Sequence, residues 1–550
     1  MQGHGKDHQS VYCYPPDYKV ITEDHTLHAS DDDDGTLKLH KDGHDPFLVT
    51  VFRRWPCFLQ AFLPACEIPS VFSNSPLHFG EMDRSWQARA SVIIINLLHS
   101  VSRPFRTVDS ALEWLLNFLP FNGGILRTAS LLAVGRWDLV TWSPPKDSPS
   151  YFSVVGWLDT RLDLLDPAAD LKETNTKSFV DLCVMASKLS YESPYVQRKV
   201  VENNWKVNTL LSYSTHNRAQ RNTTEAFIFT NKPQNANLIM VAFRGTEPLD
   251  TDDWSIDFDF SWLELDPTVG KIHIGFLEAL GLVNRNQCQT FDNFKHNCLK
   301  RALATPTPYH HRHHRTSGLI DMQQGEEQVG EKTLAFDAVN KELGRLLKKN
   351  PETRICLTGH SLGGALALAF IGILMLKRGR DATEEMILEK VSAIHTFGQP
   401  RIGDKVFAEF LNNQMEAYNI AYYRIVYSND MISRIPSDNK IFGFKHTGKV
   451  CHYYDVLFSE KAIKEVPNKN FFSPISALAM WITGVWELLR SIFLMTLTYG
   501  VGFKETTFMV LLRVFGLVCP GLLAHMPVNY VNATRLGPDV LIQCLDKGLD

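Results

Sequence analysis

GHSLGGALA, residues 359–367, is the stretch of this 550-residue chain that decides its fold. The residues before the serine, RICLTGH (354–360), form a mostly apolar run that predicts a buried strand. The residues after it, LGGALALAFIGILMLK (362–377), are apolar on most faces, which predicts a helix packed against a sheet. A strand that turns sharply through serine into a helix presents the hydroxyl at the end of the strand, and glycine neighbours let strand and helix approach closely. The pattern therefore predicts that Ser361 is a nucleophile.

An alternating strand and helix pattern surrounds this motif. Buried strands are predicted for EAFIFT, NLIMVAFRGT, KVSAIHTFG and YYRIVY, and the spacing of apolar residues in KTLAFDAVNKELGRLLKK predicts an amphipathic helix. Strands that alternate with helices indicate an α/β architecture with a mostly parallel sheet. Together with the sharp turn at Ser361, this predicts the α/β-hydrolase fold.

The acid that assists such a serine follows it in the chain and lies beyond the end of a later strand. The predicted strand YYRIVY ends at Tyr427, and Asp430 lies in the loop after it. An aspartate after a strand is also common in simple turns. Its order and position after the strand nevertheless match what the serine requires, so Asp430 is the predicted acid.

Three histidines after Asp430 are candidates for the base. His446 and His452 lie in FGFKHTGKVCHYYDV, which is predicted to be the next strand and its approaches, where a side chain packs rather than projects. His525 lies in CPGLLAHMPVNYVNATR, between two prolines and before a predicted last helix. His525 is therefore the predicted base, while His360 is expected to point away from the nucleophile.

Two backbone N–H groups must face the oxygen that becomes negatively charged during attack on an ester. One donor is normally the residue after the nucleophile, here Leu362, and the other comes from a loop after an earlier strand. NLIMVAFRGT ends in such a loop, which makes Thr246 the second predicted donor.

Composition excludes several classes of function. The formal net charge is −4 for 550 residues, which gives no reason to expect nucleic acid as a partner. The ten cysteines form no CxxC pair, so neither a zinc site nor a disulfide framework is indicated. The predicted reaction requires neither a metal nor another cofactor.

Composition divides the chain into three regions and marks two segments within the third. Residues 1–45 are polar and are predicted to be a mobile tail without a secretory signal, which makes a reducing compartment such as the cytosol the default. Residues 46–140 contain apolar and amphipathic pieces, and 141–550 is the predicted catalytic domain. Within that domain, 302–331 is a His-rich insertion expected to be a disordered loop rather than a metal site, and 469–519 is the most apolar stretch.

The apolar segments at 46–140 and 469–519 have more than one interpretation. Pro, Gly and charged residues interrupt them, so they are expected to be too short or too broken to span a membrane. The first region is predicted either to pack on the catalytic domain or to lie in a lipid surface. A droplet monolayer, a bilayer leaflet and formation of a homo-oligomer all remain compatible with these segments.

A series of motifs resembles a known family. FRGT, DDW, VGKIHIGFLEAL, TGHSLGGALA, TFGQPRIGD and SNDMISRIP occur in the order found in the class 3, fungal-type triacylglycerol lipases. The resemblance covers about 235–455 and resumes around 520–540. The long amphipathic region before the domain, the DDWSIDFDFSW stretch and the PVNYVNATRLG ending are similar to the plant oil body lipases.

The resemblance implies a function and a set of site residues. It implies a serine lipase that hydrolyses triacylglycerol at the cytosolic face of lipid droplets and releases fatty acids. Ser361, Asp430 and His525 match the triad of this family, and Thr246 and Leu362 match its oxyanion hole, whereas His446 and His273 match positions that are not catalytic. Residues 247–256 match the place of a lid. A phospholipase A1 or galactolipase, and a non-catalytic signalling scaffold on the same fold, remain alternatives.

Overall fold

The computed structural model describes most of the chain from residue 107 to residue 541. The described residues are 107–541 except 168, 170, 207–209, 216–223, 248–260, 285–286, 288, 300–333, 380, 439–442 and 470–473. The predicted tail, the first part of the 46–140 region, the His-rich insertion and almost all of the predicted lid lie outside the described residues.

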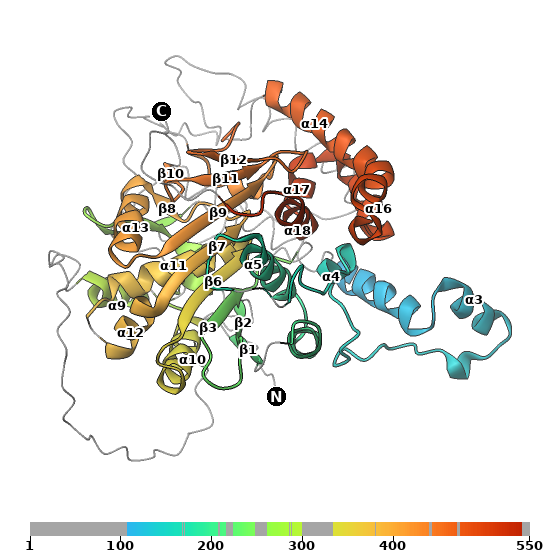
Figure 1. Ribbon diagram of the computed structural model, residues 1–550, viewed down its shortest axis with the longest axis horizontal. Helices are drawn as coiled ribbons and strands as arrows, with labels where there is room; N and C mark the ends of the chain where they lie inside the picture. The colour runs from blue at the N-terminus through green and yellow to red at the C-terminus, as the bar shows by residue number, and fades with distance from the viewer. Residues whose placement is uncertain are drawn as a thin grey trace, which may run out of the picture. The chain divides into compact units, whose positions relative to one another are not determined.

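An eight-stranded sheet forms the centre of the described fold (Figure 1). In spatial order its strands are β1 (Leu210–Thr215), β2 (Thr224–Thr230), β3 (Leu238–Phe243), β6 (Arg354–His360), β7 (Val391–Phe397), β9 (Ala421–Tyr427), β11 (Cys451–Tyr454) and β12 (Glu460–Ile463). The five strands from β3 to β11 run parallel, and β1, β2 and β12 pair antiparallel at the two edges. This order is the α/β-hydrolase fold, and it confirms the strands predicted from the sequence.

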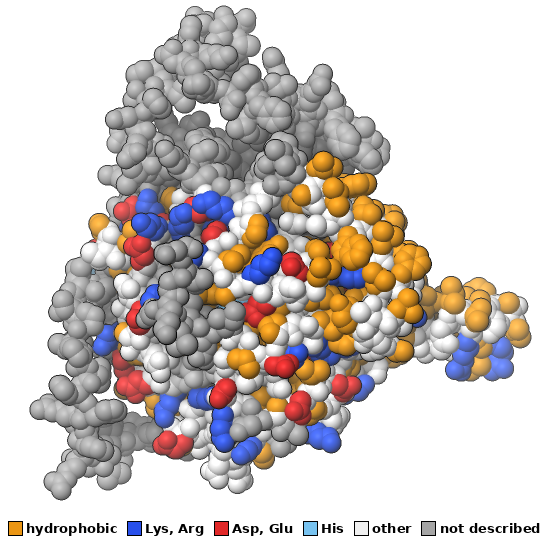
Figure 2. Space-filling model, turned by 45° about the horizontal axis from the view of Figure 1, so that its top comes forward, with side chains coloured by type: hydrophobic (Ala, Val, Ile, Leu, Met, Phe, Trp, Pro, Cys, Tyr) orange, Lys and Arg blue, Asp and Glu red, His pale blue; other side chains and the backbone are white. Residues whose placement is uncertain are grey.

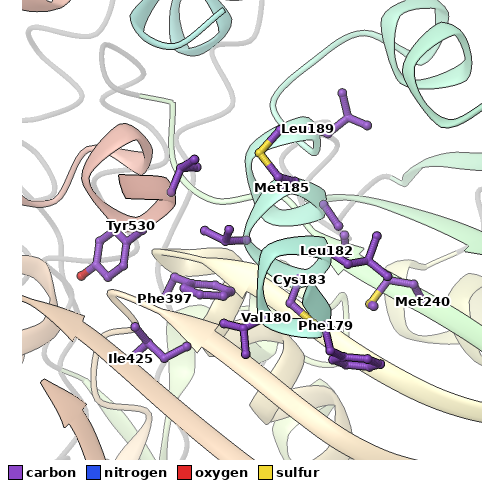
Figure 3. Close-up of a cluster of buried hydrophobic side chains, with 14 of the residues drawn as sticks. Phe179, Val180, Leu182, Cys183, Met185, Leu189, Met240, Phe397, Ile425 and Tyr530 are labelled. Atoms are coloured by element: carbon purple, nitrogen blue, oxygen red, sulfur yellow. The ribbon is translucent and has the colours of Figure 1, made fainter. Parts of the chain in front are cut away.

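Helices cover both faces of the sheet. One face carries α5 (Lys177–Leu189) and α18 (Pro527–Leu536); the other carries α10 (Ala335–Lys349), α11 (Leu362–Leu376) and α12 (Ala382–Lys390). Figure 3 shows how α5 lays Phe179, Leu182 and Met185 onto the sheet, with Tyr530 of α18 at the border of the same cluster. All fifteen residues of α11 are buried, as its apolar sequence predicts.

A second, smaller sheet and several short elements complete this core. The sheet contains β4 (Trp262–Asp266), β5 (Gly270–His273), β8 (Gly403–Asp404) and β10 (Phe444–Lys445). The helical elements are α4 (Val154–Leu158), α6 (Pro194–Lys199), η2 (Val200–Asn204), α8 (Ile274–Ala279), α9 (Gln289–Leu299), α13 (Lys405–Ala417) and η3 (Ile432–Arg434).

Helices also form in the described part of the amphipathic region. A helix covers 107–121, followed by α3 (Ile125–Ala133) and η1 (Trp137–Leu139). Large apolar side chains on these helices face solvent, including Leu126 (84% exposed) and Trp137 (59% exposed). The indole of Trp114 donates to the carbonyl of Trp142 at 2.9 Å, so the segment folds back on itself.

The apolar stretch at 469–519 folds as a set of helices before the last two helices of the chain. It contains α14 (Pro474–Leu489), η4 (Arg490–Leu494), α15 (Met495–Tyr499), η5 (Val501–Phe503), α16 (Thr507–Phe515) and η6 (Gly516–Val518), and it leads into α17 (Pro520–Ala524). The π-helical turn η4 continues the helix rather than ending it, so α14 to α15 form one continuous run.

The expectation that the helices of this stretch are too short or too interrupted to span a membrane was wrong about the length of one helix. Among the described residues, the helix Ala477–Tyr499 has the length and apolar composition that crossing a membrane requires. A core helix of a soluble protein can meet the same criterion, so the helix by itself does not decide between the two environments.

Four of the charged residues that interrupt this stretch are buried, namely Glu487, Arg490, Glu505 and Arg513, while Lys504 is exposed. Arg513 is 1% exposed and forms ion pairs with Glu505 at 2.7 Å and Glu487 at 3.0 Å. Arg490 is also buried and donates to the hydroxyl of Tyr427 at 3.0 Å. The outward side of the same helices carries the apolar residues, which Figure 2 shows as a field of hydrophobic side chains over α14 and α16. The helices are therefore apolar outside and charged inside, the reverse of the arrangement on a water-soluble surface.

Candidate active site

The turn from β6 into α11 holds Ser361 in a strained conformation. Its φ is 59° and its ψ is −134°, a conformation that residues with a side chain rarely adopt. Glycines make the turn possible: a Cβ on Gly359 would lie 2.2 Å from the backbone of Gly363, and a Cβ on Gly363 would lie 2.2 Å from the carbonyl oxygen of Phe243. The predicted elbow is confirmed, and it places the hydroxyl of Ser361 at the carboxyl edge of the parallel strands.

Three side chains that are far apart in the sequence meet at this edge. The Ser361 hydroxyl donates to Nε2 of His525 at 2.8 Å, and Nδ1–H of His525 donates to Oδ2 of Asp430 at 2.8 Å. His525 lies between α17 and α18, and Asp430 lies just after β9. We call this chain of hydrogen bonds from Ser361 through His525 to Asp430 the relay. The three residues are 3%, 4% and 0% exposed, so the relay lies in a region of low dielectric constant, where its hydrogen bonds are stronger than in water.

Four hydrogen bonds hold the Asp430 carboxylate. Oδ1 accepts the backbone N–H of Ile432 at 2.8 Å and of Ser433 at 3.2 Å, while Oδ2 accepts His525 and the hydroxyl of Tyr530. Burial by itself raises the pKa of this carboxyl, but His525 and Tyr530 favour the charged form and the net effect lowers the pKa. Asp430 is therefore a stable anion that fixes the tautomer of His525.

Tyr530 supports the acid from the opposite side. Its ring lies to one side of α5 at the border of the buried cluster (Figure 3), and its hydroxyl donates to Asp430 while accepting the N–H of Tyr427 at 3.3 Å. Burial, together with the negative charge of Asp430, raises the pKa of Tyr530 well above its usual value, so the phenol stays a donor at any physiological pH. The sequence did not identify Tyr530, because a tyrosine in a predicted core helix gives no sign of which partner its hydroxyl reaches.

His360 also contributes to the site in a way that the sequence did not predict. Its Nε2–H donates to the backbone carbonyl of His525 at 2.7 Å, and its Nδ1 accepts the hydroxyl of Tyr191 at 2.9 Å. The centroids of the His360 and His525 rings lie 4.5 Å apart, so His360 borders the base. Burial, with a further contribution from His525, lowers the pKa of His360 to about 3, which keeps the ring neutral beside His525.

The loop after β3 lies against the nucleophile. A Cβ on Gly245 would lie 3.1 Å from Cβ of Ser361 and 2.4 Å from the carbonyl oxygen of His360, so the backbone that leads to Thr246 touches the turn. Arg244 ties this loop in place through ion pairs with Glu225 at 3.0 Å and Glu247 at 3.2 Å. Leu362 is the first residue of α11, where backbone N–H groups have no acceptor within the helix. Both predicted oxyanion donors thus come from segments that border Ser361.

Comparison with known proteins identifies the family. Residues 240–440 match the family model described as Lipase (class 3). The chain is 37% identical over 492 residues to Triacylglycerol lipase OBL1 of Nicotiana tabacum, covering 83% of this chain and 84% of that protein. It is 35% identical over 484 residues to Triacylglycerol lipase OBL1 of Arabidopsis thaliana, covering 84% and 86% respectively. The chain belongs to the class 3 lipase family.

A solved structure of Rhizomucor miehei lipase in complex with its propeptide matches with 22% identity and a TM-score of 0.29, covering 45% of this chain and 55% of that one.

The remaining histidines of this class 3 lipase have partners outside the relay. The Nε2–H of His446 donates to the carbonyl of Ser433 at 2.7 Å, and His452 pairs through Nδ1 with Glu460 at 2.7 Å. His273 is buried in β5 with its ring stacked 4.1 Å from that of Phe276. The structure thus brings His525 to the serine and leaves these three histidines elsewhere.

Proposed function

We propose that this protein is a triacylglycerol lipase that uses Ser361, His525 and Asp430 to hydrolyse ester bonds and release fatty acids. The observation that carries the proposal is the continuous relay from Ser361 through His525 to Asp430, with both hydrogen bonds at 2.8 Å and the serine at a strained turn. Relatives at 35–37% identity that bear the name triacylglycerol lipase support the choice of substrate.

The reaction follows from the geometry. The Ser361 oxygen attacks the ester carbonyl while Nε2 of His525 takes its proton, and Asp430 stabilises the resulting imidazolium. The backbone N–H groups of Thr246 and Leu362 donate to the oxyanion of the tetrahedral intermediate. His525 then gives the proton to the departing glycerol oxygen and leaves an acyl group on Ser361. His525 deprotonates a water molecule that attacks this acyl-enzyme, and it then returns the proton to the Ser361 oxygen as the fatty acid leaves.

We propose that the apolar outer side of α14 to α16 and the amphipathic region at 46–140 rest on the surface of a lipid droplet, on its cytosolic side. The described part of the amphipathic region, 107–140, and the helices α14 to α16 bear large exposed apolar side chains, and buried ion pairs leave α16 with almost no charge on its outer side. Such a patch on a soluble monomer would be unusual, and it fits the boundary between head groups and acyl chains. From α14 to η6 it includes Leu478, Trp481, Ile482, Phe493, Leu497, Val501, Phe515 and Val518.

The test of substrate class compares three lipids. Wild type and Ser361→Ala are assayed on emulsified triolein, phosphatidylcholine and a galactolipid, and both are exposed to a fluorophosphonate probe. Wild type should hydrolyse triolein fastest, and Ser361→Ala should lose about 10⁴-fold in turnover, together with all labelling. Faster hydrolysis of a polar lipid would make the protein a phospholipase or galactolipase. Absence of hydrolysis and of labelling in the wild type would make it a non-catalytic scaffold.

The test of the lipid surface is flotation with purified droplets at low and high salt. Burial of apolar area resists salt, whereas electrostatic attachment weakens as the ionic strength rises. The full-length protein should float under both conditions, and deletion of 46–140 should release much of it. Release by salt alone would contradict apolar attachment, and a defined oligomer that stays in the aqueous phase would show that these helices pair with a second copy instead.

A further inference from the structure

The helices that face outward are fastened to the turn that carries His525. The guanidinium of Arg513 on α16 uses one edge for Glu505 and another nitrogen for Glu487 of α14, so one buried cation joins two of the apolar helices. A buried charge that lost its partners would be costly, so this cluster favours a single arrangement of the helices.

Asn529 continues this cluster into the active site. Nη2 of Arg513 donates to Oδ1 of Asn529 at 2.8 Å, and Nδ2 of Asn529 donates to the carbonyl of Leu523 at 2.7 Å and, more weakly, to that of Ala524 at 3.4 Å. Leu523 and Ala524 are the last residues of α17 before His525. Asn529 is 0% exposed, so water cannot replace it as the donor.

Backbone and side-chain donors together hold the turn at His525. The last carbonyls of a helix have no partner within the helix, and the residue that opens α18 is Pro527, which has no N–H to offer. The Leu523 carbonyl accepts the backbone N–H of Met526 at 3.1 Å, and the side-chain amide of Asn529 donates to the same carbonyl and to that of Ala524. Asn529 thereby helps to fix the backbone position at which α17 ends and His525 follows.

The same helices also contact the loop that carries the acid. Nδ2 of Asn429 donates to Oγ1 of Thr483 on α14 at 2.9 Å, next to Asp430. Gly484 lets α14 approach α17 closely, because a Cβ there would lie 2.8 Å from Cβ of Pro520. Base and acid are therefore both held against α14 and α16.

We propose that Asn529, fixed by Arg513, is a positioning residue that sets the distance between His525 and Ser361 and so couples the outward-facing helices to the reacting groups. The inference rests on the proposed function, since it assigns a role to a residue that would act through the base. Asn529 touches neither Ser361 nor the substrate; it acts on the backbone of the turn. Displacement of the turn by about 1 Å is enough to cost a large factor in rate.

The test replaces Asn529 by Asp, which has the same shape. The carboxylate still accepts from Arg513, but it offers no N–H to the carbonyls of Leu523 and Ala524. The matched control is Asn350→Asp at the end of α10, where a buried asparagine likewise donates to a helix carbonyl, that of Leu346 at 3.1 Å, and accepts a backbone N–H, that of Ala236 at 3.0 Å. Both variants lose a buried amide donor, and only one of them borders the His525 turn.

The readouts are the melting temperature, kcat and KM on a soluble p-nitrophenyl ester, and the rate of labelling by a fluorophosphonate. Asn529→Asp should lower kcat and the labelling rate by about tenfold or more, with KM within about twofold of the wild-type value. Asn350→Asp should show a similar loss of melting temperature with rates within about twofold of wild type. A folded Asn529→Asp protein whose rates equal those of Asn350→Asp would overturn the inference.

A second variant serves if Asn529→Asp does not fold. Arg513→Lys keeps the charge but cannot reach Glu505, Glu487 and Asn529 together, and it should slow labelling by several-fold; an unchanged labelling rate would overturn the inference. The labelling rate also separates the two proposals. A wild-type protein that the probe does not label would overturn the proposed function and this inference with it. A labelled protein that spares triolein would overturn the substrate alone, and the ratio of labelling rates would still decide the role of Asn529.

Discussion

Gly398 offers a sharp test of the relay, because a single methyl group at this position would intrude on the Asp430–His525 hydrogen bond. Gly398 follows β7 in the TFGQP motif and has φ of +64°. A Cβ there would lie 2.6 Å from Oδ2 of Asp430, 2.8 Å from the hydroxyl of Tyr530 and 2.9 Å from Nδ1 of His525. Ordinary contacts begin at 3.4 Å, so each of these atoms would have to retreat by about half an ångström or more.

Gly398→Ala should have two separable effects, a loss of folding stability and a loss of catalytic rate. Forcing alanine into a left-handed conformation costs about 1–2 kcal/mol of folding stability. Separating Asp430 from His525 stretches a 2.8 Å hydrogen bond toward the distance at which it fails and shifts the imidazole away from Ser361. A displacement of this size lowers the rate by about 10²-fold, which corresponds to about 2.7 kcal/mol in the activation free energy.

Gly135→Ala is the matched control for the backbone cost. Gly135 has φ of +75°, and a Cβ there would meet nothing within 4 Å. Melting temperatures and kcat/KM on a soluble p-nitrophenyl ester are measured for both variants and the wild type. Both variants should lose similar stability, while Gly398→Ala alone loses activity. If a folded Gly398→Ala protein keeps a kcat/KM within about threefold of the Gly135→Ala value, the hydrogen bond between Asp430 and His525 is not what orients the base.

Three further predictions address the base, the buried histidine and the outward-facing helices. His525→Ala should be about as damaging to turnover as loss of the serine, whereas His452→Ala should cost stability more than turnover; abolished labelling in His452→Ala would reverse the assignment. The pKa of His360 is about 3 in the folded protein, against an ordinary value of 6.5. As the pH falls below 6.5, the unfolded chain therefore binds a proton at this histidine that the folded chain does not. The free energy of unfolding should drop by about 1.4 kcal/mol per pH unit because of this group. Urea midpoints at pH 7 and pH 5 for wild type and His360→Asn measure this drop, and equal losses in both would contradict it. The double variant Leu497→Glu, Val518→Glu changes side chains that are 83% and 94% exposed, and it should float less with droplets but still hydrolyse a soluble ester. The control Val406→Glu on α13 should change neither flotation nor hydrolysis. Unchanged flotation of the double variant would show that the helices from α14 to η6 do not contact the lipid.

Much of the fold and the relay follows from short-range sequence patterns. The strand predicted for 354–360 is β6, and the helix predicted to begin at Leu362 is α11, because a buried strand and a buried helix each leave an apolar run that local sequence records. His525 could be chosen over His452 because proline boundaries mark a loop and an aromatic run marks a strand. Chain order and the ends of strands therefore sufficed to name Ser361, Asp430 and His525.

The supporting contacts required the tertiary structure. Tyr530 and His360 lie within motifs that the sequence had singled out, yet neither motif shows that one side chain donates to Asp430 and the other to the backbone of His525. A hydroxyl or an imidazole in an apolar segment has the same local pattern whether it is satisfied by a neighbour in the same helix or by a distant loop. Only the packing of α5 and α18 against the sheet selects the partner.

The charged residues within 469–519 show most clearly what the sequence determines and what only the tertiary structure decides. In the sequence, Glu487, Glu505 and Arg513 interrupt an apolar stretch and argue against a helix that spans a membrane. In the folded chain they pair with one another inside the protein, and Asn529 extends their network to the turn at His525. Sequence determines which residues are apolar or charged and with what period, since that is a property of the local chain. The rotation of each helix about its axis, and hence whether a charge meets solvent, lipid or a buried partner, depends on the segments packed against it, and these come from distant parts of the chain.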